Sequence, residues 1–356
     1  MDDINKKSKE ELLRDMKPPG AYLDSLSGFT DIIGTIKQAE NAAKELLIET
    51  AESTGKKKDP ENSKTPQVPE EETQAEEEPK NEKTQEELLE ILDALVGLEN
   101  IKQSVKSLIN YVKIRNLREE NELPNPPMSL HMVFAGNPGT GKTTVARILS
   151  ELYKAIGVLS KGQLVEVDRS GLVAGFVGQT AIKTSEVVAS ALGGILFIDE
   201  AYALAPDAGA GNDFGRESIE TLLKLMEDNR DDLIVIVAGY SEPMERFITS
   251  NPGLESRFNR YFYFEDYNSE QLYDIFDSMC VKSEYILTEE AKEYAREFFR
   301  KLYEMREENF GNARHVRNFF ENIVTVHSDR VSKLDGHTRD DLTMVILEDL
   351  KKAEEM

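Results

Sequence analysis

One stretch of the chain has the residues and the spacing of a phosphate-binding loop. Gly136–Thr143 fits the pattern G-x-x-x-x-G-K-[ST] at every position. Its glycines let the backbone wrap around an anion with the N–H groups pointing inward, and the helix that follows adds positive potential. We expect Lys142 to reach the β- and γ-phosphates of ATP and the Thr143 hydroxyl to ligate Mg²⁺. The predicted nucleotide-binding residues here are Gly136, Asn137, Pro138, Gly139, Thr140, Gly141, Lys142, Thr143 and Thr144.

Two adjacent carboxylates form the second half of the predicted site. Asp199 and Glu200 follow the apolar run Ile195–Ile198, which predicts a buried strand. Ligands of open parallel sheets bind at the carboxyl ends of the strands. We therefore expect Asp199 to hold Mg²⁺ and Glu200 to orient and polarise the attacking water. The second acid indicates hydrolysis of ATP rather than phosphorylation of a small molecule.

Short apolar strands that alternate with helical stretches must position these residues. Such alternation predicts an α/β fold with a parallel five-stranded sheet and helices on both faces. The predicted strands are Leu130–Ala135, Leu164–Val167, Ile195–Ile198, Leu233–Ala238 and Tyr261–Phe264. After Asp266 no further strand is expected. The pattern predicts helices over residues 268–280, 288–306, 312–332 and 339–354, which form a second, α-helical domain.

The composition divides the chain into four predicted parts. Residues 1–52 read as a helical N-terminal arm, and residues 53–85 as a disordered acidic linker. The linker is rich in proline and glutamate and has few apolar residues, so it cannot bury enough surface to offset its ordering entropy. Residues 86–266 are the predicted ATPase domain, and residues 267–356 the helical domain. The linker is either a plain tether or an acidic bait for a basic partner.

Charge and cysteine content bound the remaining possibilities. The formal net charge is −24, which disfavours binding to nucleic acid, because that binding depends mostly on neutralising phosphates. A single cysteine, Cys280, rules out an intrachain disulfide. The first residues lack the apolar core of a signal peptide, and no apolar run has the length of a membrane span. We expect a cytoplasmic protein.

Several segments together resemble one family. The P-loop is joined by Leu196–Ala201, Val237–Tyr240, Asn251–Phe258 and Gly311–Asn318. This combination is similar to the AAA+ ATPases that include the CbbX-type rubisco activases and stage V sporulation protein K. The ATPases of type VII secretion share the module. The resemblance covers about residues 86–356. It implies a P-loop ATPase domain followed by an α-helical lid.

The resemblance implies roles for two arginines. Arg257 looks like the arginine finger, which acts on the ATP of a neighbouring subunit, and Arg260 is nearby and is the alternative. Arg314 looks like the sensor-2 arginine that contacts the γ-phosphate from the lid. Arg317, one turn further on, is the weaker candidate for that role.

Two further segments gain roles from the same resemblance. Val96 and Gly97 look like part of the segment that contacts adenine. Phe176, Val177 and Gly178 look like the loop that lines the central pore of a ring and grips a peptide; the alternative is a buried loop anchor. Tyr240 replaces the polar sensor-1 residue of many AAA+ proteins, so we do not expect it to sense the γ-phosphate in the usual way.

The leading hypothesis is an ATP-driven protein remodeller. It would assemble as a homo-oligomeric ring, with a hexamer as the expected size, and act on a protein client with ATP and Mg²⁺ as its cofactors. Two alternatives stay open from the sequence. One is a nucleic-acid motor or loader on the same ATPase core. The other is a nucleotide-switched adaptor in which residues 1–52 bind the partner.

Overall fold

The structure is a computed structural model that describes residues 83–126, 129–176, 178–205 and 214–356. The predicted arm, residues 1–52, lies outside the described residues, as does the predicted linker up to residue 82. The first described helix, α3 (Gln85–Asp93), begins at the last residue of that predicted linker. Its start is set by Thr84, whose side chain accepts a hydrogen bond from the N–H of Glu87 while Glu87 bonds back to Thr84.

A parallel five-stranded sheet forms the centre of the ATPase domain, as predicted. The strands lie in the order β2-β3-β4-β1-β5, so β1 lies between β4 and β5. Their bounds are Met132–Gly136 (β1), Leu164–Val167 (β2), Ile195–Ile198 (β3), Ile234–Gly239 (β4) and Arg260–Phe264 (β5). Strands β1, β3 and β4 are buried along their whole length, which explains their continuous apolar sequences.

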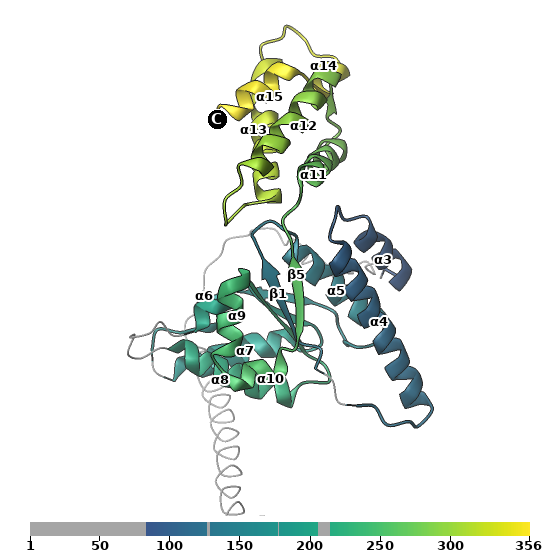
Figure 1. Cartoon of the computed structure of the whole chain (residues 1–356), viewed down its shortest axis with the longest axis vertical. Coiled ribbons are helices and arrows are strands. Elements are labelled where there is room, and N and C mark those ends of the chain that lie inside the picture. Colours follow the sequence, from purple (N-terminus) through teal and green to yellow (C-terminus); the bar gives the residue numbers. More distant parts are fainter. Residues whose placement is uncertain (1–82, 127–128, 177, 206–213) are drawn as a thin grey trace, which may run out of the picture. The chain divides into compact units, whose positions relative to one another are not determined.

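Successive residues of the central strands enter two different apolar clusters, because side chains along a strand point to alternate faces. Phe134 packs in the cluster that contains α3, α4 (Glu99–Glu120) and α5 (Lys142–Ala155). Val133 packs in the cluster with α7 (Gln179–Ala191), α8 (Phe214–Asp228), α9 (Ser241–Thr249) and α10 (Pro252–Arg257). Figure 1 shows α4 and α5 on one side of the sheet and α7 to α10 on the other. Both faces are therefore covered by helices.

Short elements complete the ATPase domain at the carboxyl ends of its strands. Helix α6 (Arg169–Leu172) follows β2, and the 3-10 helix η1 (Ala201–Leu204) follows β3 and Glu200. None of the helices in the described ranges combines the length and the apolar character that a membrane span needs.

The C-terminal part is the predicted helical lid, with one correction. Its main helices are α11 (Ser269–Lys282), α12 (Glu289–Glu304) and α13 (Ala313–Val331). The predicted absence of strands after Asp266 is wrong, and so is the single helix over residues 339–354. That segment divides into α14 (Arg339–Thr343), β7 (Met344–Val345) and α15 (Leu347–Glu354), and β7 pairs in parallel with β6 (Ile286–Leu287).

A buried ion pair accounts for the break between α14 and α15. Asp349 is 1% exposed and accepts two hydrogen bonds from Arg330 Nε, at 2.9 and 3.2 Å, and one from the N–H of Ile346 at 3.1 Å. Arg330 also donates to the Met344 carbonyl at 2.8 Å. Leaving such a charge unpaired inside a protein is costly. These bonds hold residues 344–346 extended, which helical periodicity alone does not reveal.

His131, next to β1, is buried in its neutral form. Its Nδ1 accepts a hydrogen bond from the N–H of Val235 at 3.0 Å, and burial, helped by Arg257, lowers its pKa to about 4. Below pH 6.5 the unfolded chain binds a proton at His131 while the folded chain does not, so acid favours unfolding. The stability that the neutral His131 provides is therefore complete above pH 6.5 and is lost as the pH falls toward 4.

We expect His131→Asn to remove this pH dependence, because the amide oxygen can still accept from Val235 but does not titrate. Between about pH 7.5 and pH 5, the stability of wild type relative to the variant should fall by about 2 kcal/mol. Urea unfolding at both pH values measures this difference. His337→Asn, at an exposed histidine of the lid, is the control. If wild type and His131→Asn differ in unfolding free energy by the same amount at both pH values, His131 is not the group that lowers stability in acid.

Candidate nucleotide-binding site

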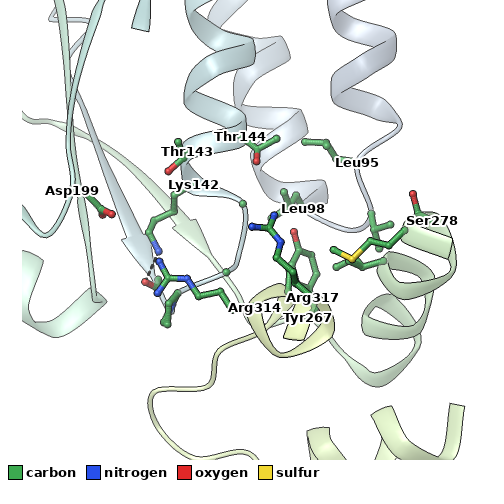
Figure 2. A pocket seen from close by; sticks show the side chains of 18 of the residues that line it. Leu95, Leu98, Lys142, Thr143, Thr144, Asp199, Tyr267, Ser278, Arg314 and Arg317 are labelled. Atoms are coloured by element: carbon green, nitrogen blue, oxygen red, sulfur yellow. Dashed lines mark hydrogen bonds between the residues drawn. The ribbon is translucent and has the colours of Figure 1, made fainter. Parts of the chain in front are cut away.

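A cavity of about 390 Å³ lies where the carboxyl ends of the strands meet the lid. Its wall on the ATPase side contains most of the P-loop with Asp199, Glu200, Gly239 and Tyr240, and its wall on the lid side comes from α11 and the start of α13. Figure 2 shows Lys142, Thr143, Asp199 and Arg314 around one end of this cavity. Its size falls within the range of ligand pockets.

The P-loop connects β1 to α5 and is shaped by two glycines. Gly141 has φ of 96° at the start of α5, a conformation that L-residues avoid. Gly139 has φ of 73°, and a Cβ there would lie 2.3 Å from the carbonyl oxygen of Gly311 in the lid. The loop and the lid therefore approach each other backbone to backbone, and only glycine fits at position 139.

Lys142 points into the cavity from the first turn of α5. Its Nζ donates to the carbonyl oxygens of Gly136 at 2.9 Å and Asn137 at 2.8 Å. Burial is the largest influence on its pKa and, with Arg314, outweighs the opposite effect of Asp199 and Glu200, so the pKa falls to about 8. A lysine with these properties gains much from an anion placed beside it.

Asp199 and Glu200 leave β3 in the direction of the P-loop. The N–H of Glu200 donates to Asp199 Oδ1 at 3.1 Å, and Glu200 has φ of 48° and ψ of 41°. A left-handed conformation is uncommon for glutamate, and such strain gathers at functional sites. Tyr202 and Tyr240 lie beside the two acids, with ring centroids 6.3 Å apart. The pKa of Tyr202 is raised to about 12 by burial and then by Glu200.

Three of the residues predicted to bind the nucleotide do not line the cavity. The Asn137 side chain donates to Asp266, and Thr140 is fully buried with its hydroxyl on the Asn137 carbonyl. Gly97 has φ of 62° in the turn between α3 and α4, where a Cβ would lie 2.6 Å from Gln271 of the lid. Val96, Thr143 and Thr144 do line the cavity, as do both lid arginines, Arg314 and Arg317.

The end of the cavity beside Val96 contains lid residues that the sequence did not single out. Ile275, Ser278, Met279 and Lys282 of α11 face Leu95, Val96 and Leu98 across it. Their spacing of three and four residues places them on one face of a helix. That periodicity was visible in the sequence, but it is shared by every helix that packs on a core. Only the tertiary structure identifies this face as a cavity wall.

Arg257 lies far from the cavity of its own chain. It ends α10, before the amino end of β5, whereas the P-loop follows the carboxyl end of β1. These strands are parallel, with Met132 beside Arg260, so the two sites are separated by the length of the strands, on the order of 15 Å. Arg257 forms an ion pair with Glu227 of α8 at 3.2 Å. Arg260 turns inward instead, donating to the Ser129 carbonyl at 3.1 Å and lying over the Tyr111 ring.

The predicted peptide-gripping loop joins α6 to α7. Phe176 is 72% exposed, so it is not a buried anchor, and Val177 lies outside the described residues. Gly178, with φ of 80°, immediately precedes α7. The base of the loop is held firmly by α7. Lys183 donates to the carbonyls of Ser170 and Val173, at 2.7 and 3.2 Å, and Thr180 accepts from the N–H of Ala174 at 3.1 Å.

Fold and site together define a class of protein. A P-loop between β1 and α5, acids at the end of β3 and a helical lid over the cavity are the parts of a P-loop ATPase. The chain belongs to the ATPase family associated with various cellular activities (AAA), whose model matches residues 132–266, and an AAA lid domain follows at residues 268–356. It is accordingly a nucleotide-binding, ATP-hydrolysing enzyme.

Curated relatives cover most of the chain. Stage V sporulation protein K of Bacillus subtilis is 41% identical over 265 residues, which span 74% of this chain and 82% of that protein. The chloroplastic ribulose bisphosphate carboxylase/oxygenase activase of Cyanidioschyzon merolae is 40% identical over 271 residues, 75% of this chain and 91% of that protein. The plasmid-encoded CbxX protein of Cupriavidus necator is 40% identical over 262 residues, 73% and 82% respectively.

Solved structures agree on the fold. A point variant of RuvB from Thermotoga maritima is similar with a TM-score of 0.50 at 15% identity, over 74% of this chain and 70% of that one. At this identity the likeness concerns the fold alone.

Proposed function

We propose that this ATPase works as a ring of identical subunits and uses ATP hydrolysis to act mechanically on a protein client. The observation that carries the proposal is the position of Arg257, at the opposite end of the strands from the nucleotide cavity of its own chain. An arginine so placed can complete only the site of a neighbouring copy. Head-to-tail contacts between identical copies form a ring when the rotation between subunits closes, and we propose a closed ring of six subunits.

Each residue of the site then has a role. Lys142 holds the β- and γ-phosphates, Glu200 orients and polarises the attacking water, and Arg314 contacts the γ-phosphate from the lid. Arg257 of the neighbouring subunit stabilises the charge that develops on the transferred phosphoryl group. Arg257 fits this role better than Arg260, because Arg260 is engaged with Ser129 and Tyr111 inside its own fold. Val96 and Leu98 contact the adenine.

A magnesium ion fits the oxygen donors of the site. Thr143 and Asp199 line the same cavity and supply a hydroxyl and a carboxylate, the ligands that this ion prefers. The described part of the chain has no group of three or more His, Cys, Asp or Glu side chains that could hold a metal by themselves. Phosphate oxygens are needed as well, so the ion would arrive with the nucleotide and neutralise its charge. Asp199 and Thr143 fix where that charge lies.

The proposed contact with the client is the loop that carries Phe176. Phe176 is 72% exposed in a loop that begins at Gly175 and ends at Gly178, so its ring is available to bind a client. The rigid base formed by Thr180 and Lys183 would transmit movement of α7 to the tip of the loop. The C. merolae relative is named as an activase of another enzyme, which supports a protein as the object of the work. The identity of the client does not follow from that name.

Phe176→Ala tests this proposal. ATP turnover of the wild-type chain should rise when casein, a permanently unfolded protein, is added, and the variant should lose this stimulation. Ile182→Ala is the matched control, because Ile182 is also apolar and 61% exposed but lies on α7 rather than in the loop. The assay measures phosphate release with and without casein and, separately, with single-stranded DNA. Stimulation by DNA instead of casein would favour the nucleic-acid motor, and equal stimulation of wild type and Phe176→Ala would contradict the role of the loop.

A further inference from the structure

A small, partly buried network joins the P-loop to the lid. Asp266, between β5 and α11, accepts hydrogen bonds from Asn137 Nδ2 of the loop at 3.0 and 3.2 Å and from Asn312 Nδ2 of the lid at 2.7 Å. Asn312 is fully buried, and its Oδ1 accepts from the N–H of Tyr267 at 2.9 Å. One carboxylate therefore holds an amide from each side of the cavity.

We propose that Asn137, Asp266, Asn312 and Tyr267 are positioning residues that couple the P-loop to the lid, so that nucleotide affinity depends on this link. The inference rests on the proposed nucleotide site and adds Asn137, Asp266 and Asn312 to it, none of which lines the cavity. The ring of Tyr267 does line the cavity, while its hydroxyl bonds to the loop. It also gives a role to Asn137, which the motif assigned to the nucleotide but which turns away from the cavity.

The contacts of the loop carbonyls explain how the link would act. Three consecutive carbonyl oxygens of the loop face donors from the lid side. Thr140 accepts from the Tyr267 hydroxyl at 3.1 Å, Gly139 from the N–H of Ala313 at 3.2 Å, and Pro138 from Asn312 Nδ2 at a longer 3.4 Å. In a P-loop the N–H groups of the same peptide units face the phosphates. A hydrogen bond to the carbonyl of a peptide unit polarises it and makes its N–H a better donor.

The backbone of Asn312 shows that its side chain is required. Asn312 has φ of 46° and ψ of −125°, a conformation in which glycine is favoured and other residues are strained. Glycine would relieve that strain but could not reach Asp266 or the Tyr267 N–H. Arg314 follows two residues later, in the first turn of α13, so the bonds of Asn312 also fix the backbone from which the Arg314 side chain extends. Any change in the loop on nucleotide binding is thereby passed to the lid, and the effect is reciprocal.

The test measures the affinity of the full chain for a fluorescent ADP analogue, which lacks the γ-phosphate and so leaves the γ-contact of Arg314 out of the comparison. Asn312→Ala and Asn137→Ala should each weaken binding roughly tenfold, and Tyr267→Phe, which removes only the hydroxyl, roughly threefold. Asn322→Ala is the matched control: this half-buried amide of α13 bonds only within the lid, to Ala353 at 3.3 Å.

Coupling predicts that the two asparagines are not independent. The Asn137→Ala/Asn312→Ala double variant should bind no more than about twofold more weakly than either single variant, because both act through Asp266. In ATP hydrolysis the Asn137→Ala and Asn312→Ala variants should raise KM by a larger factor than they lower kcat. Arg314→Ala should instead affect mainly kcat. Losses that multiply in the double variant, or Asn312→Ala binding like wild type, would overturn the proposal. If Asn312→Ala does not fold, Asn137→Ala decides in its place, because the Asn137 side chain bonds to Asp266 and does not line the cavity.

Lys142→Ala separates failure of this inference from failure of the nucleotide site. If Lys142→Ala binds the analogue as tightly as wild type, the site itself is misassigned. If Lys142→Ala loses binding but Asn137→Ala, Asn312→Ala and Tyr267→Phe all retain it, the site stands and only the coupling is rejected.

Discussion

Replacing Lys142 with alanine is expected to reduce ATP turnover by at least roughly a hundredfold, mainly through lost nucleotide binding, because bonds from a charged donor to phosphate are among the strongest in proteins. Lys142 is largely buried, and burial has already lowered its pKa to about 8. Inside the cavity its ammonium donates to two neutral loop carbonyls. Phosphate oxygens would replace neutral acceptors with charged ones.

Calorimetry with ATP and magnesium measures the binding, and phosphate release measures the turnover. Lys113→Ala, at an exposed lysine of α4 that does not line the cavity, is the control. The pH dependence gives a second check. Binding requires the charged lysine, so the affinity of wild type should fall as the pH rises above 8, by up to roughly tenfold per unit. Turnover by Lys142→Ala at the wild-type rate would remove the basis of the assignment.

The second large effect is expected from Arg257→Ala, which should lower turnover roughly a thousandfold while ATP still binds. The reason is geometric, because in the proposed ring Arg257 would supply its charge to the site of a neighbouring subunit. Mixing two inactive variants tests this directly. An Arg257→Ala subunit keeps its Glu200, and a Glu200→Gln subunit keeps its Arg257. Where a Glu200→Gln subunit places its Arg257 against the nucleotide of an Arg257→Ala subunit, an intact site would form.

A one-to-one mixture of these variants should regain activity, with about a quarter of the sites intact if subunits are placed at random in a head-to-tail ring. Phosphate release is followed as the variants are combined after dissociation. Arg246→Ala, at an exposed arginine of α9, is the matched control and should behave like wild type. A mixture no more active than its components, with assembly confirmed by sedimentation, would show that Arg257 does not act between subunits.

Much of the fold followed from patterns within single segments. The five strands were visible as short runs of mostly apolar residues. Three of them, β1, β3 and β4, are buried along their whole length and contain no charged residue. The P-loop and the pair Asp199–Glu200 were visible because each lies in one short stretch beside its strand. The two-residue strands β6 and β7 were missed, since so short a run has no periodicity. The segment that contains β7 is held extended by the ion pair between Arg330 and Asp349, which are 19 residues apart.

The parts of the site that the sequence could not predict come from distant contacts. Asp266 and Asn137 are 129 residues apart, and Asn312 lies 46 residues beyond Asp266. The motif places Asn137 correctly in the loop but does not say which way its side chain turns. The resemblance named both Arg257 and Arg260 as candidates for one role. The inward contacts of Arg260, visible only in three dimensions, favour Arg257 for that role.

The ion pair between Arg257 and Glu227 bears on how readily Arg257 could move to a neighbouring subunit during ATP hydrolysis. The two side chains are 27% and 52% exposed, and pairs accessible to water are worth only about 0–1 kcal/mol. Transfer of the guanidinium from Glu227 to a phosphate of the neighbouring subunit would therefore break only a weak ion pair, at little cost. The proposed subunit interface could therefore open and close in each round of hydrolysis. A monomer, whose Arg257 stays paired with Glu227, would hydrolyse little ATP.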